Sequence, residues 1–435
     1  MAEVSLEEII AEKAFVAILE SHAEMFFRLA NTLLARPESD WTRGQFFQLI
    51  SEADTLEAFL DDYGARYNRT FAFLRELVAS VRGIALAGFS VSHLERRMES
   101  YGLSLSMRDT DLATVSIQSS KQFLRGAQLG LLKAAREEGV ALGLRVSDDS
   151  FPESRFRSDV SRQRLPRNMG QVDLENDEQK VAEVASKFLQ ACGMFEDLAV
   201  RRIHNEGERE QFMSRFCSEE QARVYEATVH NLQSAYDTHV KNTVLEARDS
   251  RLPKLRGHVS AALHLLEAVT QLTHFVERHE SGVRNEAVEG RIGRLVERGA
   301  VREVTLNHLL YWAVLFMRRG KPLAEDLLPS YTNVQVLEVV LPEDVLLHAR
   351  PAALIVGIVN RYGTPVEMEI AGRKCNAASI LELMVNVGSH PHARQFTFRG
   401  DENPLRDIRL LFEHGLGEGG INSLPDELAY LRSNA

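Results

Sequence analysis

The chain is poor in cysteine and carries no excess of positive charge. Its three cysteines, Cys192, Cys217 and Cys375, lie far apart and form no CxxC pair. This pattern suits a reducing cytoplasm and gives no metal signature. The formal net charge of −11 argues against broad binding to nucleic acids or to anionic membranes, because both require a basic surface. We therefore expect a cytoplasmic protein with no nucleic-acid partner.

Long apolar runs are also missing. The strongest run covers residues 306–317 and is closed by Arg318 and Arg319. It is shorter than the roughly 20 apolar residues that span a membrane. We interpret it as a buried helix, with an interfacial segment as the alternative, and expect no membrane insertion. The acidic N-terminal residues are not followed by an apolar export segment with a basic lead.

Common catalytic and metal-binding motifs are absent. The sequence contains no phosphate-binding GxxxxGKS or GxxxxGKT loop, no GxGxxG after a predicted strand and no GxSxG. We therefore expect no cofactor and no phosphorylation of the chain by itself from ATP. His258, His264, His274 and His279 lie on a predicted helix over residues 255–280, but no two of them are spaced i, i+4. We interpret them as ordinary core or surface residues and expect no metal site.

The chain is instead rich in helical patterns. Low counts of glycine (27) and proline (12) in 435 residues fit long helices, and 44% apolar residues fit a globular chain of several domains. Apolar residues at helical spacing predict a helical domain over residues 1–145 and a second helical block over residues 178–330. Residues 146–177 are polar, and we interpret them as a linker or long loop.

The predicted linker carries several arginines among interleaved acids such as Asp148 and Asp159. One interpretation is a docking patch for an acidic partner or a phosphate. The other, favoured by the interleaved acids, is a solvated linker of mixed charge. The arginines are Arg155, Arg157, Arg162, Arg164 and Arg167.

After Pro329 the apolar residues change from helical spacing to alternation. Alternating apolar residues predict strands near residues 337–341, 366–370 and 396–398. Strands that alternate in this way bury one face, so we expect an antiparallel sheet with one covered face.

Three helical patterns lie among these strands. The last of them has Asn403 as its expected N-cap and Pro404 at its first helical position. The predicted order is β-α-β-β-α-β-α, which gives an α+β domain over residues 334–418 with its helices on one face of the sheet. Residues 419–435 are left as a C-terminal tail.

His348 stands directly before the first of these three helices. The start of a helix leaves about four backbone N–H groups unpaired and adds about half a positive charge, so it stabilises an anion. A neutral imidazole at this position could attack a phosphoryl group, and Arg350 could neutralise the charge that arrives. Pro351 fits within the first turn, where its missing N–H costs nothing.

Three segments give this region a resemblance to a known family. Residues 347–353 read Leu-His-Ala-Arg-Pro-Ala-Ala, residues 376–380 read Asn-Ala-Ala-Ser-Ile and residues 400–402 read Gly-Asp-Glu. In order and spacing they resemble the histidine-containing phosphocarrier (HPr) family of the bacterial phosphoenolpyruvate:sugar phosphotransferase system. The resemblance covers residues 334–418 and implies an open-faced β-sandwich. The helical region carries no such resemblance.

The resemblance implies a phosphoryl-carrier protein rather than a self-sufficient enzyme. His348 would accept a phosphoryl group from enzyme I, which phosphoenolpyruvate phosphorylates, and would pass it to an acceptor protein. Arg350 would pair with the phosphoryl oxygens, and the helix start around Pro351 would supply fixed dipoles. Two alternatives stay open: a module that only docks partners without phosphotransfer, and an enzyme hidden in the helical region.

The resemblance also implies a regulatory and a docking role for residues of the second helix. Ser379 occupies the position of a regulatory serine in many family members, and the alternative is a plain N-cap residue. Four residues correspond to the apolar patch through which the family docks partners, and the alternative for each is ordinary core. These residues are Leu347, Ile380, Leu381 and Met384. The helical region is expected to bind partners or to form homo-oligomers.

Overall fold

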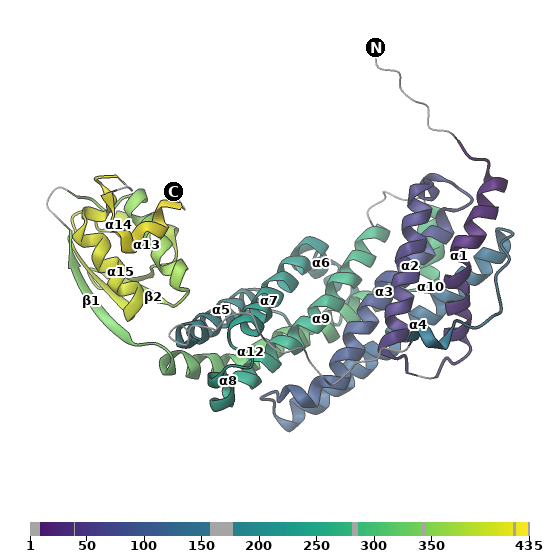
Figure 1. The fold of residues 1–435 in the computed structure, drawn as a ribbon, viewed down its shortest axis with the longest axis horizontal. Coiled ribbons are helices and arrows are strands. Elements are labelled where there is room, and N and C mark those ends of the chain that lie inside the picture. Colours follow the sequence, from purple (N-terminus) through teal and green to yellow (C-terminus); the bar gives the residue numbers. More distant parts are fainter. Residues whose placement is uncertain are drawn as a thin grey trace, which may run out of the picture. The chain divides into compact units, whose positions relative to one another are not determined.

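The computed structural model describes residues 9–38, 40–156, 177–280, 286–341, 345–420 and 423–433 (Figure 1). Up to residue 330 the described chain is mostly helical, and a small antiparallel sheet follows near its C-terminus. A helical region followed by an α+β region is the fold class that the sequence predicts.

The chain divides into two compact units whose segments alternate along the sequence. Unit 1 consists of Met1–Asn168, Leu198–His230 and Val259–Phe316, and unit 2 consists of Met169–Asp197, Asn231–His258 and Met317–Ala435. The consecutive domains expected from the sequence divide the chain differently, and their boundaries stay a prediction.

Three long helices contribute residues to both units, which explains why consecutive boundaries are hard to draw. They are α7 (Glu219–His239), α9 (Arg251–Glu280) and α12 (Tyr311–Leu327). A π-helical segment, Val304–Leu310, leads directly into α12. Trp312 and Phe316 are at most 1% exposed, so the apolar run over residues 306–317 is a buried helix, as the sequence predicts.

Three of the other helices of unit 1, α2, α4 and α6, begin at side-chain caps. Thr42 and Gln45 form a reciprocal capping box at the start of α2, and Ser106 caps α4 through the N–H of Asp109. The other helices of unit 1 are α1 (Glu12–Leu34), α2 (Arg43–Asp62), α3 (Ala72–Arg97), α4 (Met107–Ala141), α6 (Glu206–Phe216), α10 (Glu286–Leu295) and α11 (Arg298–Glu303).

Helix α3 is apolar over most of its length. The stretch Ala72–Tyr101 is long and apolar enough to cross a membrane by length and composition alone, and 67% of its most apolar window is buried inside the structure. Leu74, Leu77 and Ile84 are fully buried within unit 1. These contacts are those of a core helix.

The first part of the predicted linker packs against helices of unit 1. Phe151 is 1% exposed, and its backbone N–H donates to the Thr32 hydroxyl at 2.7 Å. Arg28 donates to the Ser150 carbonyl at 3.0 Å. Of the arginines expected in this segment, Arg155 lies 3.5 Å from Glu52, and the others lie outside the described residues.

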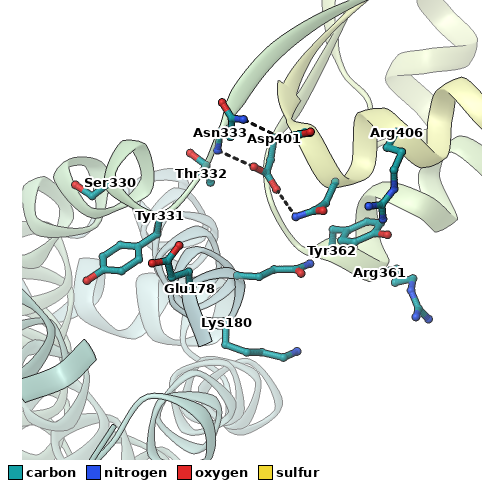
Figure 2. Close-up of a pocket in the computed structure, with 13 residues that line it drawn as sticks. Glu178, Lys180, Ser330, Tyr331, Thr332, Asn333, Arg361, Tyr362, Asp401 and Arg406 are labelled. Carbon is teal, nitrogen blue, oxygen red and sulfur yellow. Dashed lines mark hydrogen bonds between the residues drawn. The ribbon is translucent and has the colours of Figure 1, made fainter. Parts of the chain in front are cut away.

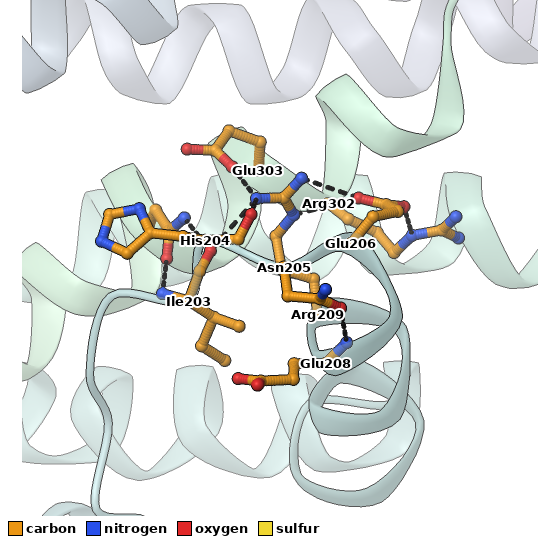
Figure 3. A network of polar contacts seen from close by, with 9 residues as sticks. Ile203, His204, Asn205, Glu206, Glu208, Arg209, Arg302 and Glu303 are labelled. Atoms are coloured by element: carbon orange, nitrogen blue, oxygen red, sulfur yellow. Dashed lines mark hydrogen bonds and ion pairs between the residues drawn. The ribbon is translucent and has the colours of Figure 1, made fainter.

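A polar network joins the loop before α6 to helix α11 (Figure 3). Arg209 donates to Glu206, to Glu303 and to the carbonyl oxygens of Ile203 and His204. Its side chain is only 13% exposed. Because Arg209 serves both carboxylates and backbone carbonyls, it fixes the entry of the chain into α6.

Unit 2 contains α5 (Asp177–Asp197), the short α8 (Val244–Arg248) and the C-terminal α+β region. The four strands of that region pair antiparallel in the order β1-β4-β2-β3. Along the chain the elements are β1 (Val334–Val340), α13 (Ala349–Tyr362), β2 (Val366–Ile370), β3 (Arg373–Asn376), α14 (Ile380–Ser389), β4 (Gln395–Asp401) and α15 (Glu402–Glu413).

Alternation in the strands produces one covered face. Val366, Met368 and Ile370 are at most 2% exposed, and they share a core with Phe396 and Phe398. The helices α13 and α15 supply the other side of this core. Residues on the opposite face of β1 are open to solvent, as the 58% exposure of Val336 shows.

Helix α15 corrects one expectation. Asp401 is its N-cap, so Asn403 lies inside the first turn and Pro404 at the third helical position. The carboxylate of Asp401 is instead used by the loop before β1, where it accepts from the backbone N–H of Asn333 at 2.8 Å.

The expected C-terminal tail packs on the α+β region. Leu424, Leu428 and Leu431 are at most 2% exposed and join the same core as the strands. Asp407 of α15 accepts from the hydroxyls of Tyr362 and Tyr430, each at 2.7 Å. Burial, together with the nearby Asp407 carboxylate, raises the pKa of Tyr430, so its hydroxyl stays a donor.

Arg209→Ala is expected to destabilise unit 1. The change removes hydrogen bonds to two backbone carbonyls, takes the cationic partner from Glu303 and leaves Glu206 with Arg302 alone. We expect the free energy of unfolding to fall by about 2 kcal/mol or more, measured by urea denaturation followed by circular dichroism.

Lys133→Ala is the matched control, since Lys133 and Glu137 meet at 4.0 Å with side chains 72% and 67% exposed. Such a pair contributes about 0.3–0.5 kcal/mol.

A pH series adds a second check. Burial would raise the pKa of Glu206, but hydrogen bonds from Arg302 and Arg209 hold that pKa below its ordinary value. The stabilisation is present above the unfolded-state pKa of about 4.3 and is lost as pH falls through the folded-state pKa. The free energies of unfolding of the wild type and Arg209→Ala should therefore approach each other at low pH. A difference between them that stays constant as the pH falls would contradict this account.

Candidate functional site

His348 is the N-cap residue of α13. Its backbone is extended (φ −112°, ψ −170°), and the helix begins at Ala349. Its Nδ1 accepts a hydrogen bond from the backbone N–H of Arg350 at 3.3 Å. The side chain is 50% exposed, so the ring stands at the surface with one nitrogen directed at the positive end of the helix.

The second ring nitrogen of His348 meets a carboxylate. Nε2 lies 2.8 Å from Oε1 of Glu418. Because Nδ1 accepts a hydrogen bond, the proton of the neutral ring is on Nε2, the nitrogen that lies against this carboxylate. The negative charge of Glu418 favours this tautomer, which leaves the Nδ1 lone pair facing the helix start.

A tight turn after α15 positions Glu418. Gly415, Leu416 and Gly417 have positive φ angles of 63°, 55° and 72°, and the N–H of Glu418 donates to the Gly415 carbonyl at 3.1 Å. The Leu416 side chain is fully buried in the core and holds the turn in place. A Cβ at Gly417 would come within 3.0 Å of the Leu354 side chain, so the turn fits closely against α13.

No motif in the sequence points to a role for Glu418. Its local signal is an acid inside the glycine-rich run that follows the last helix. That signal is weak, because it does not say which of the preceding residues the carboxylate reaches. Only the packing of the turn on α13 brings Glu418 to His348.

Arg350 is exposed at the second position of α13, two residues after His348. Within the described part of the chain its guanidinium group has no hydrogen bond and no ion pair. A cation at this place is thus available to an incoming anion. Pro351 is buried in the first turn, where it has no N–H to satisfy.

Ser379 caps α14. Its hydroxyl accepts from the N–H of Glu382 at 3.3 Å, and the Glu382 carboxylate accepts from the N–H of Asn376 at 2.9 Å. Both side chains are therefore tied into the first turn of the helix. The regulatory role expected for Ser379 stays a prediction.

Helix α14 carries an exposed apolar patch. Ile380, Leu381 and Val385 are 44%, 72% and 50% exposed, and they lie on one side of the helix. Met384 lies between them and is partly buried against the core. The name "α14 patch" is used below for Ile380, Leu381 and Val385.

Two leucines before His348 correct the expected docking set. Leu347 is 5% exposed and belongs to the domain core, so it is not part of an exposed surface. Its neighbour Leu346 is 65% exposed. Successive residues of extended chain point to opposite sides, and the sequence motif alone does not say which of the two points inwards.

A large polar cavity of about 870 Å³ lies elsewhere in unit 2 (Figure 2). None of its lining residues belongs to the His348 site. Cationic and acidic side chains are balanced around it, so no single ligand charge is favoured. The cationic residues are Lys180, Arg361 and Arg406, and the acidic residues are Glu178, Asp401 and Glu402.

The comparison with protein families agrees with the geometry. A family model described as the PTS HPr component phosphorylation site matches residues 337–389. This segment includes His348, Arg350 and Ser379. No family model matches the helical region. No solved structure matches the chain. The resemblance of the C-terminal region to the HPr family is thereby confirmed, and an HPr domain supports a phosphocarrier type of role in the phosphotransferase system.

Loss of the α14 cap is expected to destabilise the C-terminal region. Ser379→Ala removes the acceptor for the Glu382 N–H and should lower the free energy of unfolding by about 1 kcal/mol. Ser379→Asp retains an N-cap acceptor and adds negative charge at a helix start, so it should unfold close to the wild type. Urea unfolding of the two variants checks the pair. Equal destabilisation of both would contradict a capping role.

Proposed function

We propose that this chain is a cytoplasmic bacterial phosphocarrier or regulator of the phosphoenolpyruvate-dependent phosphotransferase system. In this proposal residues 334–418 form an HPr-like open-faced β-sandwich of the order β-α-β-β-α-β-α. His348 accepts a phosphoryl group from an enzyme I-like donor and passes it to, or signals through, a partner protein. The observation that carries the proposal is the half-exposed imidazole held between the start of α13 and the carboxylate of Glu418.

The arrangement supports Nδ1 as the nitrogen that reacts. The Nδ1 lone pair of His348 attacks phosphorus as the bond between phosphorus and its atom on the donor protein breaks, and that donor atom leaves with the bonding electron pair. Nε2 keeps its proton throughout, so the phosphorylated ring gains positive charge. The Glu418 carboxylate, 2.8 Å from Nε2, offsets that charge.

The incoming phosphoryl oxygens need cationic and dipolar partners. Arg350 has an unengaged guanidinium group, and its backbone N–H already points at Nδ1. Phosphoryl transfer depends mainly on positioning and on electrostatic stabilisation of this kind. The N–H that now donates to Nδ1 can turn to a phosphoryl oxygen once the lone pair has reacted.

The helical region is assigned the role of a platform that binds partners or forms homo-oligomers. In this view the phosphorylation state of His348 reports the supply of phosphoenolpyruvate, and the helical region passes that state on. The second candidate function is a docking module that is never phosphorylated. The exposed α14 patch supports it, because docking alone would require such a surface and no reactive histidine.

Phosphorylation of His348 is the first test. Incubation of the full chain with enzyme I and phosphoenolpyruvate should yield an acid-labile, base-stable phosphate that His348→Ala abolishes. Glu418→Gln keeps a hydrogen-bond acceptor but loses the charge, and should slow transfer about tenfold or more.

The matched controls are His392→Ala and Glu413→Gln, which change an exposed histidine and an exposed glutamate outside the site. Both should accept phosphate at the wild-type rate. If the wild type takes up no label from enzyme I of several sources, phosphotransfer is excluded and the docking candidate is favoured.

The α14 patch gives a second test. Leu381→Glu places a charge on the most exposed apolar residue of the patch and should raise the KM for enzyme I at least tenfold, with a smaller effect on kcat. Val336→Glu is the control, because Val336 is 58% exposed on the opposite face of the sheet. Equal effects of the two variants would remove the patch from the docking surface.

A further inference from the structure

A second cavity lies inside unit 1, on residues of α3, α7 and α9. Its volume is about 290 Å³. Since a molecule of liquid water occupies about 30 Å³, the cavity is of a size for a small molecule and not for a peptide. Neither the resemblance nor the proposed phosphocarrier function assigns it a role.

The cavity lining is rich in guanidinium groups. Arg82, Arg223 and Arg278 line it, and Glu76 is the one acid in its described lining. His274 also lines the cavity, but burial lowers its pKa, so the ring counts as neutral near pH 7. The lining therefore carries two more positive than negative charges.

The acids next to the cavity are already engaged with other groups. Glu57 accepts from Arg75 at 2.8 Å and from Arg82 at 2.7 Å. Glu219 accepts from Arg223 at 2.6 Å. The charges of these two carboxylates are therefore already shared with Arg75, Arg82 and Arg223, and neither carboxylate comes within hydrogen-bonding distance of Arg278.

Arg278 is the group left without a close partner. Among the described residues it has no hydrogen bond, and its nearest acid is Glu57 at 3.9 Å. Its side chain is 31% exposed. Burial, with repulsion from Arg75 and Arg66, lowers the pKa of Arg278 despite the attraction of Glu57. A guanidinium group in this position gains stability from any anion that enters the cavity.

Two further residues of α3 leave room and polarity for a ligand. A Cβ at Gly83 would meet no atom within 4 Å, so this glycine keeps space open although it weakens a helix interior. Ser80 is 4% exposed, and its hydroxyl has no hydrogen-bond partner among the described residues. An oxygen of a ligand bound in the cavity would supply the hydrogen-bond partner that the Ser80 hydroxyl lacks.

We propose that this cavity binds a small phosphate-bearing anion, held by the guanidinium group of Arg278 together with those of Arg82 and Arg223. A phosphate supplies negative charge to Arg278, which has no carboxylate within hydrogen-bonding distance. A phosphate group also has more oxygens than a single carboxylate, so several guanidinium groups can bind it at the same time. The site is independent of His348.

Calorimetric titration of the full chain at constant ionic strength tests this site. Inorganic phosphate and glycerol 3-phosphate should each saturate one site per chain. Malonate, a dianion without a phosphate group, should bind at least tenfold more weakly. Arg278→Gln should raise the Kd for phosphate about ten- to a hundredfold, the usual effect of losing hydrogen bonds to a charged group.

Gly83→Leu removes space instead of charge and should also abolish binding. It leaves every arginine of the cavity unchanged, so a loss of binding in this variant, once folding is verified, reports the loss of space and not a loss of charge. Circular dichroism should show wild-type helix content in both variants. Arg69→Gln makes the same charge change as Arg278→Gln on an exposed turn outside the cavity and should bind phosphate normally. His348→Ala should do so as well, which separates this site from the start of α13.

Three results would overturn the proposal. The first is the absence of saturable binding of either phosphate probe to the wild type. The second is unchanged phosphate binding in folded Arg278→Gln and Gly83→Leu. The third is malonate binding as tight as that of phosphate, which would remove the phosphate assignment.

Discussion

The contact between His348 and Glu418 is the constraint on which the candidate site depends. The negative charge of the carboxylate favours the proton on Nε2, and the Nδ1 lone pair then faces the start of α13. Without this contact the ring could rotate or exchange tautomers, and the dipoles of the helix start would face no defined lone pair. One contact from a turn some seventy residues further along the chain thus orients the imidazole of the motif.

The C-terminal region supports that contact through its core. The buried Leu416 anchors the turn that bears Glu418, while Leu424 and Leu428 extend the same core into the segment expected to be a tail. The hydroxyls of Tyr362 and Tyr430 meet on Asp407, which ties α13 and the last segment to α15. The position of the His348 imidazole is therefore a property of the whole packed region and not of residues 347–353 alone.

The helical region shows a different use of charge. Arg209 and Arg75 are engaged with carboxylates and hold helices together, as expected for arginines that are mostly buried. The side chain of Arg278 is 31% exposed, and no carboxylate comes closer to it than Glu57 at 3.9 Å. Charge that the fold does not compensate internally is a stronger indication of a ligand than charge on an open surface, because solvent compensates the latter.

The sequence by itself determined the class of the fold, the strand alternation of Val366, Met368 and Ile370, and the position of His348 before a helix, because these follow from local periodicity and helix-start chemistry. The tertiary structure decided that Leu347 is core while Leu346 is exposed, that Asp401 and not Asn403 precedes α15, and that Glu418 reaches the imidazole. Each of these depends on how one element packs on another. The spacing of residues along the chain cannot supply that information, since the same sequence pattern is compatible with either leucine pointing inwards and with Glu418 facing towards or away from His348.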